Sequence, residues 1–237
     1  MSIKTKVLVG AAALALAGGL GASALATAGT ANAATPSCGG NCIDIFSHQF
    51  GTFANPHFVL DVYKQQQAVG APIILFRTSN SDPAEDFTIS DQGSVADFHA
   101  AGLVSSALNL HYSGDEAFEF EYAPFGADTG LCVGVAATAV AGEKVSLQPC
   151  GVSSKTVWVV DTLDSPFTIS VPLINGSDTN FSHPFVLTYP ASSYPTDSPR
   201  PQLFVTNITG ESNGAGPILG TVNSNQLWAA DTGVLTH

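Results

Sequence analysis

Alternation of apolar and polar residues dominates the chain after its first forty residues. The segment DEAFEFEY, residues 115–122, places three aromatic side chains on one strand face and two glutamates on the other. The aromatic face comprises Phe118, Phe120 and Tyr122, and the acidic face comprises Glu119 and Glu121. We expect the first face to be core and the second to be solvated, although two carboxylates could also hold a cation. Short Val-, Ile-, Phe- and Thr-rich runs end at Gly, Pro, Asn or Asp, so the pattern predicts a nearly all-β chain.

A two-strand unit recurs three times along the chain. FVLDVYKQQQAVGAPIILF (58–76) and LCVGVAATAVAGEKVSL (131–147) share one order: an apolar strand, a polar turn with glycine, and a second apolar strand. A looser third copy runs through 185–207. The three copies predict pseudo-threefold symmetry, and a fold closed by such units leaves no bare sheet edge. The aromatic residues that end the copies are Phe87, Trp158 and Trp228.

The copies are unequally spaced, which places insertions at 90–127, 162–183 and 208–222. Loops carried by a rigid scaffold often hold binding or catalytic residues, so these insertions are candidate functional regions.

The first 33 residues have the features of a signal peptide. A basic start at Lys4 and Lys6 precedes an Ala/Leu/Gly-rich stretch and a small-x-small sequence that ends at Ala33. The apolar part is shorter than the roughly 20 residues that a spanning helix needs, so we expect secretion and no membrane association. The Ala-rich composition is similar to leaders of actinobacterial type. The remaining chain divides into an N-terminal arm, 34–56, and a single domain, 57–237.

Charge narrows the possible partners. The chain has 19 acidic and seven basic residues, for a formal net charge of −12. This balance argues against nucleic acid, whose phosphates require Lys and Arg, and against anionic lipid surfaces. Neutral glycans, cationic partners and divalent cations remain compatible with it.

Four cysteines in an exported chain favour two disulfides, for which three pairings are possible. We expect the local pairings Cys38–Cys42, within SCGGNC, and Cys132–Cys150, which flank a turn-containing segment. Zinc ligation is the weaker alternative because no His pair or repeated CxxC spacing accompanies them. We expect no metal and no cofactor.

The second copy resembles a repeat of the ricin-type β-trefoil lectins. Its LCV…VSLQPC…VW layout is similar to the family's Cys-Leu-Asp start, second cysteine and Gln-x-Trp end. Gln226-Leu227-Trp228 matches Gln-x-Trp in full, whereas residues 85–87 and 156–158 depart from it. The resemblance implies an all-β fold of β-trefoil type, with long loop insertions and an N-terminal arm.

The resemblance also implies where a sugar would bind. In such a repeat an aspartate accepts bonds from sugar hydroxyls, an aromatic ring stacks on the sugar, and polar side chains complete the site. The second copy has lost these parts, with Gly134 in place of the aspartate. Asp61 can alternatively be a turn residue that accepts backbone N–H bonds. The first-copy candidates are Asp61, Phe76, Asn80, Asp82 and Glu85, and the weaker third-copy candidates are Phe204 and Gln226.

No catalytic motif stands out. The six histidines are scattered, and the densest titratable cluster surrounds His111 in a chain rich in acidic residues. The sequence therefore predicts a secreted, non-catalytic, lectin-like module that binds a glycan or cell-wall polysaccharide. The alternative is a protein-binding adaptor, for example in a secreted antibacterial toxin assembly, that uses residues 34–56 or the loops. A secreted hydrolase is the third hypothesis.

Overall fold

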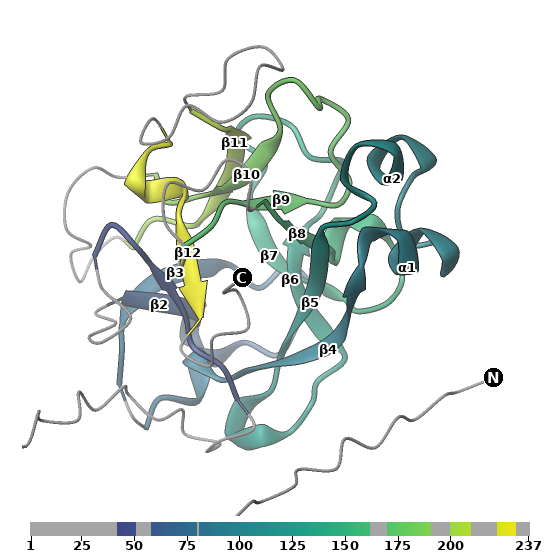
Figure 1. Cartoon of the computed structure of the whole chain (residues 1–237). Helices are drawn as coiled ribbons and strands as arrows, with labels where there is room; N and C mark the ends of the chain where they lie inside the picture. Colours follow the sequence, from purple (N-terminus) through teal and green to yellow (C-terminus); the bar gives the residue numbers. More distant parts are fainter. Residues whose placement is uncertain are drawn as a thin grey trace, which may run out of the picture. The chain divides into compact units, whose positions relative to one another are not determined.

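The described part of the chain is nearly all β-structure, as the alternation pattern predicted (Figure 1). The computed structural model describes residues 42–50, 58–79, 81–161, 170–190, 200–209 and 222–230. The strands are β1 (Ile45–Ser47), β2 (Phe58–Val62), β3 (Ile73–Arg77), β4 (Phe87–Ser94), β5 (Glu116–Tyr122), β6 (Leu131–Val135), β7 (Val145–Pro149), β8 (Trp158–Val160), β9 (Leu173–Asn175), β10 (Phe185–Thr188), β11 (Phe204–Asn207) and β12 (Trp228–Ala230). The helices are α1 (Val95–Ala100) and α2 (Ser106–Tyr112), and the 3-10 turns are η2 (Tyr63–Gln65), η3 (Pro83–Glu85), η4 (Pro124–Gly126), η5 (Ser154–Thr156) and η6 (Ser224–Gln226). Among the described residues, no helix is long and apolar enough to cross a membrane.

Six of the strands follow one another around a closed ring. β4 pairs with β5, β5 with β8, β8 with β9, and β12 with β1, all antiparallel. Two isolated bridges complete the ring, Ile43 to Phe87 and Val171 to Trp228. Each of these strands is thus supported on both sides.

The other six strands form three hairpins, β2–β3, β6–β7 and β10–β11. They coincide with the three two-strand copies seen in the sequence, and isolated bridges join each hairpin to the other two. Each hairpin is followed by a 3-10 turn and then by an aromatic residue that begins a ring strand. The order strand, hairpin, turn and strand therefore occurs three times.

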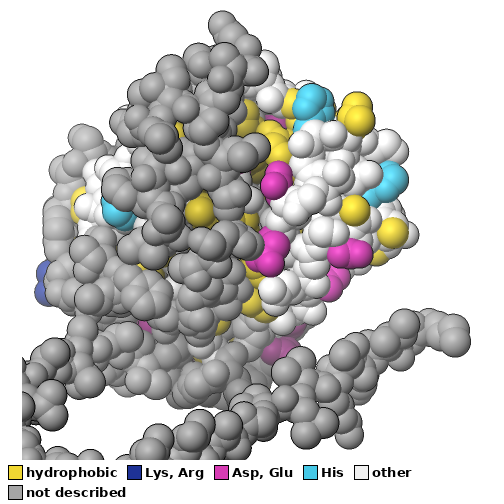
Figure 2. All heavy atoms as spheres, viewed as in Figure 1, with side chains coloured by type: hydrophobic (Ala, Val, Ile, Leu, Met, Phe, Trp, Pro, Cys, Tyr) yellow, Lys and Arg dark blue, Asp and Glu magenta, His cyan; other side chains and the backbone are white. Residues whose placement is uncertain are grey.

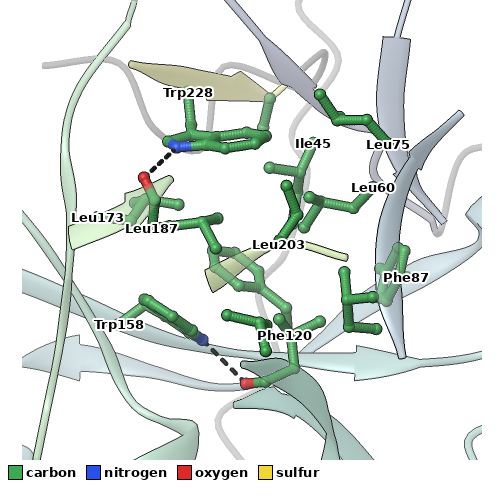
Figure 3. Packing of buried hydrophobic residues seen from close by; sticks show 14 of the residues in the cluster. Ile45, Leu60, Leu75, Phe87, Phe120, Trp158, Leu173, Leu187, Leu203 and Trp228 are labelled. Atoms are coloured by element: carbon green, nitrogen blue, oxygen red, sulfur yellow. Dashed lines mark hydrogen bonds between the residues drawn. The ribbon is translucent and has the colours of Figure 1, made fainter. Parts of the chain in front are cut away.

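The aromatic residues that end the copies lie in one core. Phe87, Trp158 and Trp228 are all fully buried in the largest apolar cluster (Figure 3). The indole N–H of Trp158 donates to the carbonyl of Val133, and that of Trp228 donates to the carbonyl of Leu187, both at 2.9 Å. Because a buried indole needs a partner for its N–H, these equivalent bonds fix each Trp over the first strand of its own hairpin.

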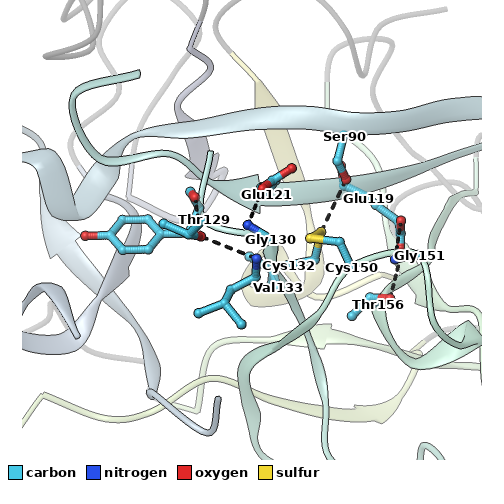
Figure 4. The surroundings of a disulfide bond; sticks show 12 residues. Ser90, Glu119, Glu121, Thr129, Gly130, Cys132, Val133, Cys150, Gly151 and Thr156 are labelled. Atoms are coloured by element: carbon cyan, nitrogen blue, oxygen red, sulfur yellow. Dashed lines mark hydrogen bonds between the residues drawn. A yellow bond between two sulfur atoms is a disulfide. The ribbon is translucent and has the colours of Figure 1, made fainter. Parts of the chain in front are cut away.

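The acidic face of β5 is buried, which corrects the expectation of a solvated face. Glu119 is 1% exposed and Glu121 is 8% exposed. Glu119 accepts from the amide of Gly151 and the hydroxyl of Thr156, and Glu121 accepts from the amide of Gly130 (Figure 4). These hydrogen bonds compensate for the hydrogen bonds to water that a carboxylate loses when it is buried.

The cysteine pairing is confirmed where the structure describes it. Cys132 and Cys150 form a disulfide across the β6–β7 hairpin (Figure 4). Cys42 is also disulfide-bonded, and Cys38 lies outside the described residues.

Part of the expected N-terminal arm is a strand of the domain itself. β1 pairs with β12 on one side and with β2 on the other. These backbone groups are occupied within the chain's own sheet, so this part of the arm cannot add a strand to a partner. Residues 34–41 and 51–57 lie outside the described part.

Two short helices occupy the predicted insertion 90–127, where no helix was expected. Ser94 caps α1 through a capping box with Asp97, and Ser105 caps α2. Val95, Phe98 and Leu108 pack in a second apolar cluster against strands of the ring. Helices of six and seven residues are too short to give a sustained 3.6-residue pattern, which explains why the sequence did not reveal them.

Candidate functional site

The threefold recurrence allows the same two positions to be compared in each unit. One is the fourth position of the hairpin's first strand, and the other is the last residue of the following 3-10 turn. The strand register and the turns define the pairs as Asp61 with Glu85, Gly134 with Thr156, and Thr188 with Gln226.

The first unit brings three of its predicted site residues together. One oxygen from each of Asp61, Asp82 and Glu85 lies within 4.8 Å of the other two. Asp61 comes from β2, and the other two carboxylates begin and end the η3 turn. Oδ1 of Asp82 accepts from the amide of Ala84 at 3.0 Å and from Nε2 of Gln65 at 3.1 Å. Asn80 lies outside the described residues.

Burial and mutual repulsion raise the pKa values of this cluster. Burial raises the pKa of Asp61 to about 7, with a further increase from the charge of Asp82 that Arg200 opposes. Burial raises the pKa of Glu85 to about 9. The amide of Ser79, which donates to Oε2 of Glu85 at 2.9 Å, lowers that pKa, and Asp44, Asp61 and Asp82 raise it. In the absence of a cation, Glu85 therefore keeps its proton at neutral pH.

The predicted stacking ring of the first unit is covered by a cation. The guanidinium of Arg200 lies 3.5 Å from the centroid of the half-buried Phe76 ring. A pyranose would need this face, so it would have to displace a cation–π contact. Asp61 is only 3% exposed, which further limits access.

The second unit has no space for a side chain at the position of the aspartate. An added Cβ on Gly134 would lie 2.7 Å from the carbonyl oxygen of Lys155 and 2.9 Å from Cγ2 of Thr156. The Thr156 hydroxyl is itself occupied by Glu119. Close packing therefore explains why this copy lacks an aspartate.

The third unit uses its polar residues internally. Oε1 of Gln226 accepts from the amide and hydroxyl of Thr209, and Nε2 donates to the carbonyl of Asn207 at 2.9 Å and to Oγ1 of Thr188 at 3.4 Å. Gln226 is 1% exposed, so its hydrogen bonds connect parts of the third unit to one another and are not available to a ligand.

The third-unit aromatic candidate lies outside the ring position. The strand register puts Thr206, rather than Phe204, in the place of Phe76, and Phe204 lies beneath the ammonium of Lys144. This unit consequently retains no stacking ring at that position.

Sequence reasoning missed an open pocket next to the η4 turn. Its volume is about 390 Å³, within the range of about 300–1,000 Å³ typical of ligand pockets. Phe125, which is 73% exposed, lines it together with Gln67, Asp128 and Thr129. The pocket combines an exposed ring with hydrogen-bonding side chains. Its remaining lining residues are Pro124, Ala127 and Leu131.

The backbone holds Phe125 in an unusual conformation. Its φ of 56° lies in the left-handed region, which is uncommon for residues other than glycine. Its amide donates to Oδ2 of the fully buried Asp86 at 2.8 Å. APFGA in the sequence gives no sign of this, because the aromatic looks like one more core residue and Asp86 is 39 residues away.

The face in Figure 2 shows the charge balance of the chain at the surface. Acidic side chains recur over the described part of this face, whereas Lys and Arg appear only at its left edge. An uncharged ligand or a cation suits such a surface better than an anion.

Comparisons with known proteins support the fold but no activity. No family model matches the chain, and no curated protein matches it in sequence. The structure is similar to a designed threefold-symmetric protein, ThreeFoil, with a TM-score of 0.50 and 12% identity over 80% of this chain and 97% of the design. An earthworm R-type lectin C-half, solved with GalNAc, gives a TM-score of 0.40 and 13% identity over 80% of this chain and 97% of the lectin. A mosquitocidal holotoxin gives 0.48 and 12% identity, and the match spans 17% of its length and 80% of this chain.

Proposed function

We propose that the protein is a secreted, non-catalytic carbohydrate-binding protein with a β-trefoil fold. The three units of four strands and the similarity to a threefold-symmetric design support the fold. The open pocket at Phe125 is the observation that carries the proposed activity. Secretion rests on the predicted signal peptide, residues 1–33, and N-terminal sequencing of the exported protein would test it.

The pocket has the chemistry that a neutral sugar requires. An exposed aromatic ring can cover the apolar C–H face of a pyranose. Asp128 is exposed, and its Oδ1 accepts a bond from Thr88 at 3.1 Å. Its other oxygen and the exposed Gln67 side chain are suited to sugar hydroxyls. The backbone strain at Phe125 keeps the ring outside the core at a cost of about 1–3 kcal/mol, which favours a role in binding.

This pocket is the better candidate because it is accessible without rearrangement. In the first-unit site, Asp61 is buried and Arg200 covers Phe76. Phe125 needs no such displacement, since most of its surface is already open. The Asp61 site therefore stays a secondary hypothesis that the same experiment addresses.

Binding of the purified protein to a glycan array and to insoluble cell-wall polysaccharides tests the proposal. The variants are Phe125→Ala in the pocket, Asp61→Asn in the first-unit site, and Leu110→Ala as a matched control. Leu110 is 81% exposed on α2 and does not line the pocket. We expect Phe125→Ala to lose about tenfold or more in affinity, since covering an aromatic side chain contributes about 1.5–3 kcal/mol and about 1.4 kcal/mol is tenfold. Leu110→Ala should bind as the unmodified protein does.

Two results would contradict the pocket assignment. If Asp61→Asn alone lost binding, the site would lie in the first unit. If the folded, unmodified protein bound no glycan, carbohydrate binding would be wrong, and a protein partner captured by the loops would become the next hypothesis to test.

A further inference from the structure

The first unit lacks a donor where the third unit has one. Gln226 places an amide NH2 against the Asn207 carbonyl and the Thr188 hydroxyl. The equivalent residue, Glu85, accepts through Oε2 from Ser79, as Gln226 accepts through Oε1 from Thr209. Its other oxygen, Oε1, takes the place of the NH2 group.

That oxygen has no partner among the residues the structure describes. Glu85 is 2% exposed, and Oε1 is a buried atom without a hydrogen bond. An unsatisfied buried acceptor is costly, and a carboxylate oxygen more so than a neutral one. Either a proton on Glu85 itself or a bound cation would compensate Oε1.

Two further carboxylates lie close to that of Glu85. Asp61 and Asp82 each bring an oxygen within 4.8 Å of one on Glu85. Within the described ranges, the Asp61 carboxylate accepts no hydrogen bond, and Arg200 is the cation that acts on it. Because Arg200 is placed over the Phe76 ring, its charge is shared with a second contact.

We propose that Asp61, Asp82 and Glu85 bind a divalent cation, and that the ion is Ca²⁺. A set of three carboxylates offers only oxygen ligands, which suits Ca²⁺ or Mg²⁺ better than zinc or copper. Two oxygens bound to one Ca²⁺ at about 2.3–2.6 Å can lie up to about 5 Å apart, and the oxygens of the cluster lie within 4.8 Å of one another. Mg²⁺ binds at about 2.0–2.1 Å and demands near-octahedral geometry, so Ca²⁺ tolerates a wider range of separations.

The ligand set leaves room for the higher coordination number of Ca²⁺. The unpartnered Oε1 of Glu85 and the oxygens of Asp61 need no existing bond to be broken. Asp82 is half-buried at the outer side of the cluster, where water can complete the shell. The inference does not rest on sugar binding, since Phe125 and its pocket supply none of the ligands.

Calcium titration of the purified protein, first stripped with EDTA, tests this site. Calorimetry should show one bound ion per chain. The Tm should rise by about 5–10 °C at a calcium concentration 100 times Kd. Mg²⁺ at the same concentration should give a smaller rise.

The variant Glu85→Gln separates ion binding from a structural role. Gln226 shows that this scaffold accommodates an amide at the equivalent position, so the variant should fold. We expect it to bind calcium at least tenfold more weakly and, at the same calcium concentration, to show at most about half of the rise in Tm. Asp91→Asn is the matched control, since Asp91 is an exposed acid on β4 outside the cluster. It should retain the full response.

Any one of three results would overturn the proposal. These are no heat of calcium binding with the unmodified protein, a full calcium response in Glu85→Gln, or a loss of the response to the same extent in Asp91→Asn. Equal stabilisation by Mg²⁺ would overturn the assignment to Ca²⁺. None of these readouts contains a glycan, so failure here and failure of carbohydrate binding are distinguishable.

Discussion

Replacing Thr156 by valine tests how the second unit satisfies its buried acid. The Thr156 hydroxyl donates to Oε1 of Glu119, and both residues are buried to 1% exposure or less. The amide of Gly151 also donates to this carboxylate and lies 3.0 Å from each oxygen. Valine has nearly the same shape as threonine, so the change removes the donor and leaves the packing in place.

The expected cost follows from the charge and the burial of the acceptor. A hydrogen bond to a charged group contributes about 1.5–3 kcal/mol, and leaving a buried charged group short of a donor places the loss in the upper part of that range. A loss of about 2–3 kcal/mol corresponds to about 4–12 °C in Tm for a domain of this size. The same hydroxyl also lies 3.1 Å from the carbonyl of Ser153, but that neutral bond contributes less.

Urea unfolding, followed by the fluorescence of the buried Trp158 and Trp228, measures the free energy of unfolding. Thr156→Ser is the control because it keeps the hydroxyl and loses a methyl group, and it should recover most of the stability. The reasoning is refuted if valine costs less than about 0.5 kcal/mol, or if serine and valine cost the same. The double change with Glu119→Gln should then show whether the lost energy belongs to this pair.

Two further changes probe packing and protonation. Gly134→Ala should destabilise the protein by about 1–3 kcal/mol, because the new Cβ would overlap the backbone and a side chain of the η5 turn. Gly114→Ala is the control, since nothing lies within 4 Å of its Cβ, and it should be neutral in the same unfolding assay. Burial raises the pKa of Asp178, against the effect of backbone N–H bonds, so the folded state holds a proton that the unfolded chain releases above about pH 4. The stability of the unmodified protein relative to Asp178→Asn should therefore fall as pH rises from 4 through the folded pKa, by at most about 1.4 kcal/mol per pH unit, and a relative stability that rises over this range would contradict the raised pKa.

The sequence predicted those features that depend on local pattern. The hairpins at 58–77 and 131–149 follow from two-residue alternation on either side of a glycine-containing turn. Trp158 and Trp228 could be placed at equivalent ends of two copies because a similar short segment surrounds each of them. A pattern that is contained in about twenty residues can be recognised without knowing which distant residues pack against it.

The sequence failed where a remote residue decides the environment. Alternation along β5 is compatible with one solvent-exposed face. Gly151 and Thr156, more than thirty positions away in the sequence, nevertheless donate hydrogen bonds to the buried Glu119. Arg200 covers Phe76 from the third unit, and no spacing in the chain predicts that contact. Sequence reasoning grouped Asp61, Asp82 and Glu85, whose carboxylates lie close together, but it did not indicate which surfaces stay open.

The three units show how one scaffold position can take three chemical solutions. Gln226 satisfies the position with an amide that both donates and accepts, and Thr156 satisfies it with a hydroxyl that is directed to a buried acid. Glu85 has the shape of Gln226 without its donor, next to two more carboxylates. Since the other two units show that the fold does not require an acid at this position, the acid at Glu85 calls for a different explanation. A bound cation supplies one, because it would convert the repulsion among the three carboxylates into coordination.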